Sequence, residues 1–242
     1  MSTVNEYSVK PVGQPDGYDY YIPFNAEQSR LLEKADYKAR MAVMNMAAVI
    51  VSNTDFSSAL YEKFYNRLRK YEREYENLKN EVSANIVLPF IDSIHGDRSN
   101  VSVKWVHSFK TPFIAVKYTY DVDDHSFEKD LVVGEYSAAD VGIDDTVISA
   151  LENLSVSTQA DDEVFKFIAR NYPEPDERQQ ANIDKFADAK DDRMCEYEEL
   201  KASVTNTVNT FLAANGIGST SDTLQWNLNF GSKIVAITKD RT

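Results

Sequence analysis

The feature that most constrains the fold of this 242-residue chain is a weak internal repeat. Three stretches recur later in the sequence, in the same order. The stretch from Val4 to Asp16 recurs 129 positions later, and the stretch that begins at Ala59 recurs 122 positions later. The third contains Trp105, which aligns with Trp226 at an offset of 121, and the chain has no other tryptophan. Self-similarity of this kind is typical of duplicated structural units.

The collinear order of the matches predicts a tandem duplication. One repeat unit is expected at 1–121 and a second at 133–242, with an acidic inter-repeat linker at 122–132. The offset between matching residues falls from 129 to 121 along the chain, which predicts that the second copy lost residues, mostly in its first helical region. The expected fold class is α+β, in which each unit has long amphipathic helices followed by an antiparallel β-hairpin.

Helical periodicity is clearest in the second helix of each unit. From Thr54 to about Val87, apolar residues recur at spacings of three and four and define one face. The stretch from Asp176 to Ala214 repeats this pattern, and Asn215-Gly216 is a typical helix stop. Glutamates on these helices are interpreted as partners of nearby lysines, as in Glu76 with Lys79, and not as paired catalytic carboxylates.

The first helix is expected to differ between the units. In the first unit it should start after Asn25, a suitable N-cap, and run through 41–51. In the second unit, 144–154 and 162–171 are predicted to form two shorter helices that end before Pro173. Before these helices, a short extended segment is expected to open each unit, at Val4–Ser8 in the first.

Alternation of apolar and polar residues predicts a hairpin at the end of each unit. In the first unit the strands are 103–109 and 113–120; in the second they are 224–230 and 234–238, joined at Gly231-Ser232. A third strand at 131–136 is expected to pair with these. An isolated hairpin is barely stable in water, so the face that carries the tryptophan must pack on a helix.

The sequence shows no familiar catalytic motif. A glycine-rich phosphate loop, a nucleophile elbow and a zinc-protease helix are all missing, and a single cysteine, Cys195, excludes an internal disulfide. His107 is interpreted as a packing residue and His95 as a helix-end residue. His125 lies among acids that fail the EF-hand pattern, and a solvated linker is preferred there. We therefore expect no enzyme, no cofactor and no metal site.

Negative charge is concentrated in one region. Between Asp121 and Glu163 there are thirteen acids and one base, out of a net charge of −13 for the chain. Such a field repels nucleic acid. The region is either a docking surface for a basic partner or for divalent ions, or simply a solubilising surface. A basic run at Arg67, Arg69, Lys70 and Arg73 has acidic or neutral counterparts in the second unit, Ala189, Asp191, Asp192 and Cys195. The candidate partner-binding residues are five of the thirteen acids and three residues of the basic run, namely Asp121, Asp123, Asp124, Asp161, Asp162, Arg67, Arg69 and Lys70.

These observations favour a non-catalytic structural or adaptor subunit of a larger protein assembly, for which a phage virion is one context. Protein partners are expected in a homo- or hetero-oligomer, with no nucleic acid and no membrane, in the cytoplasm or a virion. The alternative is an acidic binding module that captures a basic protein or mimics DNA. A third hypothesis is an enzyme with dispersed carboxylates.

Overall fold

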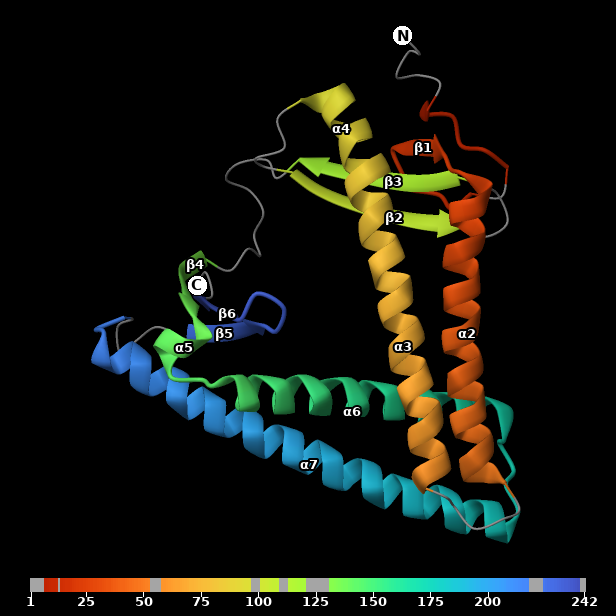
Figure 1. Cartoon of the computed structure of the whole chain (residues 1–242), viewed down its shortest axis with the longest axis vertical. Coiled ribbons are helices and arrows are strands. Elements are labelled where there is room, and N and C mark those ends of the chain that lie inside the picture. Colours follow the sequence, from red (N-terminus) through yellow and green to blue (C-terminus); the bar gives the residue numbers. More distant parts are fainter. Residues whose placement is uncertain are drawn as a thin grey trace. The chain divides into compact units, whose positions relative to one another are not determined.

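The computed structural model shows an α+β protein (Figure 1). It describes residues 7–12, 14–52, 58–96, 101–108, 113–120, 131–217 and 224–239. The chain divides into two compact units. Unit 1 contains Met1–Met46 and Ser58–Ser126, and unit 2 contains Ala47–Ser57 and Phe127–Thr242. The predicted linker lies largely outside the described residues, which resume at Leu131.

Unit 1 is built from three strands and a set of long helices. In chain order these are β1 (Tyr20–Pro23), α2 (Ala26–Val51), α3 (Ser58–Val82), the π-helical turn η1 (Ser83–Val87), α4 (Leu88–His95), β2 (Val101–Ser108) and β3 (Phe113–Tyr120). The last five residues of α2, 47–51, belong to unit 2. The amide of Glu27 donates to the side chain of Asn25 at 2.8 Å, which confirms the expected start of α2. Helix α4 ends at Gly96, whose φ of 73° suits glycine.

The three strands of unit 1 form an antiparallel sheet in the order β1-β3-β2. On the central strand, Ile114 and Val116 are fully buried, and Trp105 of β2 lies directly opposite Val116. One face of the sheet packs on the helices through Leu32 of α2 and Ile91 of α4. Alternation along each strand therefore places the apolar residues against the helices, as the sequence predicts.

Unit 2 has the same kinds of element. They are β4 (Leu131–Ser137), α5 (Ala138–Val141), α6 (Asp145–Asn171), α7 (Glu177–Ala214), β5 (Leu224–Asn229) and β6 (Ile234–Lys239). Side-chain caps fix the helix starts: Asp144 accepts from the amides of Thr146 and Val147, and Asp176 forms a capping box with Gln179. Helix α7 ends where expected, and Gly216 has a φ of 64°.

The sheet of unit 2 has the order β4-β6-β5. Its central strand buries Val235 and Ile237, and Trp226 of β5 lies directly opposite Ile237. This face packs against Val208 of α7 and Leu151 of α6. In both units, therefore, the last strand in the sequence is central and the first strand pairs with it at one edge. The predicted third strand is confirmed as β4.

Two expectations about the first part of each unit are wrong. The described residues Tyr7 and Ser8 are not in a strand, and the edge strand of unit 1 is Tyr20–Pro23. In unit 2, α6 is one continuous helix and not two. Its interior hydroxyls do not break it, because Ser157 and Thr158 donate to the carbonyls three residues earlier, at 3.0 and 2.9 Å.

Helices α6 and α7 are joined by a buried ion pair. The side chain of Asp161 on α6 is 2% exposed, and Nε and Nη2 of Arg193 on α7 each lie 2.7 Å from its Oδ2. One turn away, Lys190 lies 3.0 Å from Asp162, which is 44% exposed. A charge pair in the interior is far more sensitive to loss of one partner than a pair in water.

We predict that Arg193→Met lowers the free energy of unfolding by about 3–5 kcal/mol, because it leaves a buried carboxylate without its cation. The matched control, Lys190→Met, leaves Asp162, whose side chain is 44% exposed and remains solvated, and should change stability by less than about 1 kcal/mol. Urea unfolding monitored by circular dichroism measures both. Equal effects of the two substitutions would show that the Asp161 pair is not energetically distinct.

Candidate protein-interaction surfaces

The structure separates the tentative partner-binding residues into several environments. Asp121, Asp123 and Asp124 lie outside the described residues, as does His125. Asp161 is held inside unit 2 by Arg193, and Asp162 pairs with Lys190. Of the acids named from the sequence, only Asp162 is thus both described and accessible, and it already has a partner.

The side chains of the basic run on α3 point in two directions. Arg69 turns inward, is 19% exposed, and lies 3.6 Å from Glu72. Arg67 and Lys70 point to solvent, and Arg67 lies over the Phe64 ring at 5.4 Å. They border a shallow hollow of about 490 Å³, whose lining residues are Ala59, Glu62, Lys63, Asn66, Arg67 and Lys70.

Two further cations share this exposed face of α3. Residues three and four apart on a helix are neighbours, so Lys63, Arg67, Lys70 and Arg73 follow one another along one side. All four are exposed. We call them the basic stripe. Arg73 belongs to the basic run seen in the sequence, and helical spacing adds Lys63 to it.

An acidic counterpart runs along the exposed side of α7. Five acids at helical spacing are all exposed, and none of them is in an ion pair within the described part of the chain. These residues are Asp188, Asp191, Asp192, Glu196 and Glu199. We call them the acidic stripe. The sequence identifies Asp191 and Asp192 as counterparts of the basic run on α3, and the structure adds Asp188, Glu196 and Glu199 on the same side of α7.

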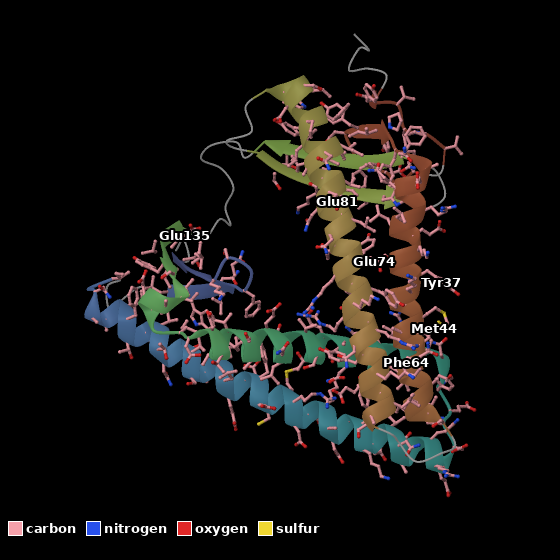
Figure 2. All side chains as sticks on the ribbon, viewed as in Figure 1. Tyr37, Met44, Phe64, Glu74, Glu81 and Glu135 are labelled. Atoms are coloured by element: carbon pink, nitrogen blue, oxygen red, sulfur yellow. The ribbon has the colours of Figure 1, made fainter. Side chains whose placement is uncertain are left out.

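Exposed apolar side chains form another surface, on α2. Tyr37 is 62% and Met44 is 42% exposed, and both project from the side of α2 turned away from α3 (Figure 2). Leu31, which is 39% exposed, and Tyr37 both line a groove of about 540 Å³ along α2. The apolar periodicity of the sequence does not distinguish these exposed side chains from those that face the core.

Unit 2 also has a groove of about 540 Å³ beside the edge strand β5. Trp226 forms part of its wall, and the indole Nε1 donates to Thr205 Oγ1 at 3.1 Å. Tyr197 and Phe230 also line it, with Lys201 at the rim. Lys201 lies 3.9 Å from Glu198, as Lys79 lies 4.0 Å from Glu76, so the expected glutamate–lysine pairs are confirmed in both units.

The histidines of unit 1 have structural surroundings. His95 is the last residue of α4, stacks on Tyr118 with ring centroids 3.9 Å apart, and bonds to the Tyr20 hydroxyl at 2.8 Å. His107 Nε2 lies 2.9 Å from Ser29 Oγ and its ring meets the Phe24 ring edge-on. These are the helix-end and packing positions that the sequence predicts.

A serine beside a histidine can also act as a nucleophile beside its base. The residues at the matching positions of unit 2 indicate whether packing alone explains this pair. Ser29 is the fourth residue of α2, and Ile148 is the fourth residue of α6. His107 lies opposite Ile114, and Leu228 lies opposite Val235 at the matching place in the other sheet. Both Ile148 and Leu228 are buried. The positions therefore belong to the core of each unit, which favours packing over catalysis.

Burial lowers the pKa of the His107 imidazole below its ordinary value of 6.5, since desolvation disfavours the charged form. The unfolded chain consequently binds a proton more readily than the folded chain, and the free energy of unfolding decreases as pH falls through about 6.5. We predict that His107→Leu flattens the dependence of stability on pH between about 7 and 5.

Urea midpoints across this pH range measure the difference between variant and wild type. Ser29→Ala keeps the imidazole buried and should keep the wild-type slope. An unchanged slope in His107→Leu would contradict the assignment of this pH dependence to His107.

No group of three or more histidine, cysteine, aspartate or glutamate side chains among the described residues is arranged to hold a metal ion. None of the described helices combines the length and apolar character that a membrane span needs. Comparison with protein-family models, characterised proteins and solved structures gives no match.

Proposed function

We propose that this protein is a non-catalytic structural or adaptor subunit of a larger protein assembly, made by tandem duplication of one α+β unit. A virion, such as that of a phage, is one assembly of this kind. The observation that carries the proposal is that the two units have matching cores and different surfaces. A duplicated chain of this type presents two related modules, each with its own contact face, to its neighbours.

Support for duplication comes from the buried positions. Both sheets have the same strand order and the same register within the hairpin, with an offset of 121 between Trp105 and Trp226 and between Val116 and Ile237. Further buried pairs with the same surroundings are Leu32 with Leu151, Val82 with Val204, Val87 with Val208 and Ile91 with Leu212.

The π-helical turn η1 accounts for a change in the sequence offset between the two units. The offset is 122 at Val82 and 121 at Val87, so the first unit has one more residue between these positions than the second. A π turn closes hydrogen bonds over one residue more than an α turn and so absorbs a single insertion. In unit 2 the corresponding valines, Val204 and Val208, are four apart in regular α-helix.

The matched positions correct the alignment of the first part of the units. Tyr20 lies opposite Val116 as Gly134 lies opposite Ile237, which gives an offset of 114 and not 129. Helices α2 and α6 have 26 and 27 residues, so the expected loss in the first helix of the second copy is wrong. Unit 2 instead contains the extra turn α5 between its first strand and first helix.

If η1 holds one inserted residue, deleting Asn85 should restore a regular helix with the spacing of unit 2. We predict that this deletion changes the free energy of unfolding by about 1 kcal/mol or less. Deleting Asn77, an equally exposed asparagine in regular helix, rotates the two sides of the core by about 100° and should cost more than about 4 kcal/mol. Equal losses in the two variants, measured by thermal and urea unfolding, would contradict the insertion.

Assembly is tested with the full chain. We expect size-exclusion chromatography with light scattering to give a molar mass that rises with concentration above the 27.5 kDa of one chain. The physical reason is that the exposed stripes and apolar face offer several contact surfaces. A particle that stays at 27.5 kDa up to the highest soluble concentration would contradict self-assembly.

The exposed acidic stripe of α7 supports a second candidate, an acidic module that captures a basic protein or mimics DNA. Under this alternative the chain remains monomeric alone and gains mass only when a basic protein is added. The same light-scattering measurement therefore separates the two candidates.

A further inference from the structure

Two similar helix faces of opposite sign stand out among the surfaces. The basic stripe and the acidic stripe lie on α3 and α7, the second long helix of each unit. At the offset of 122 that relates these helices, Lys70 corresponds to Asp192 and Arg67 to Ala189. The core-facing sides remain alike while the solvent-facing sides differ in charge. This divergence needs a reason outside the fold of either unit.

The stripes also match in extent. The basic residues occupy positions 63–73 and the acidic residues positions 188–199, so each covers about 15 Å of helix at 1.5 Å per residue. Four cations face five anions, all exposed. Lys63, Lys70 and Arg73 are in no ion pair within the described residues, so they can meet an external partner without breaking a contact.

We propose that the basic stripe of α3 binds the acidic stripe of α7 in a second copy of this chain. The inference rests on the proposed function and specifies the contact through which the subunits assemble. Because the two surfaces are different, a bound pair of copies keeps one basic stripe free on one copy and one acidic stripe free on the other. Such a head-to-tail contact continues from copy to copy, into a ring or a filament.

The net charge of −13 opposes the approach of two copies and also disfavours nucleic acid as a partner. At physiological ionic strength the screening length is about 8 Å, so adjoining stripes attract while the remaining charge is largely screened. A second copy supplies an acidic stripe that matches the basic stripe in extent.

The experiment reverses each stripe separately. The α3 variant carries Lys63→Glu, Arg67→Glu and Lys70→Glu, and the α7 variant carries Asp188→Lys, Asp191→Lys and Asp192→Lys. All six side chains are exposed, so both variants should keep the wild-type circular dichroism spectrum and urea midpoint. We expect each variant alone to return to the 27.5 kDa of one chain in light scattering.

The molar mass of a mixture of the two variants is the decisive measurement. Each carries a complement to the other, so the mixture should recover the wild-type mass, and recovery requires two different chains. The matched control is Lys166→Glu, Arg170→Glu and Arg178→Glu, which shifts net charge as the α3 variant does, at exposed sites outside both stripes. It should assemble as wild type does.

The outcomes separate this contact from the proposed function. Wild-type assembly that persists in the α3 variant overturns the contact and leaves the assembly role intact. A monomeric wild type overturns both. A mixture of the two variants that stays monomeric overturns the contact. The contact is also overturned if the wild type and the α7 variant bind a DNA duplex and the α3 variant does not, because this would assign the basic stripe to nucleic acid.

Discussion

The structure depends on covering one face of two very small sheets. Three short strands cannot hold together in water unless their apolar face is buried. In unit 1 the central strand buries Ile114 and Val116 against helices, and in unit 2 Val235 and Ile237 are buried in the same manner. This requirement sets the apolar side of those helix segments that lie against the sheets. The π turn places both Val82 and Val87, which are five residues apart, on that side.

The parts of the fold that the sequence predicts are those with local signals. Hairpins show alternation over six to eight residues, and α3 and α7 show helical spacing over many turns, so both could be located. Strand β1 has only four residues, and its partner β3 lies far along the chain, so no local pattern identifies it. In the sequence, the polar residues at the centre of α6 indicate a break between two helices. In the structure, their hydroxyls donate hydrogen bonds within one continuous helix.

The interaction surfaces were harder to predict, because charge in a sequence does not reveal burial. Asp161 and Asp162 are neighbours in the chain, yet one is in the interior and the other at the surface. Arg69 and Lys70 likewise point in different directions. Helical phase groups Lys63 with Lys70, and it extends Asp191 and Asp192, the counterparts of the basic run, to the other acids of the acidic stripe. What it could not provide is the tertiary partner, such as Arg193, that removes a charge from the surface.

Helix α7 has a mechanical consequence. Its 38 residues make a rod of about 57 Å. Near one end Asn182 donates to the Ser52 carbonyl and Phe186 is fully buried, while near the other end Val208 and Leu212 lie under the sheet. One continuous helix therefore links two separate buried regions of unit 2, and its stiffness fixes the distance between them.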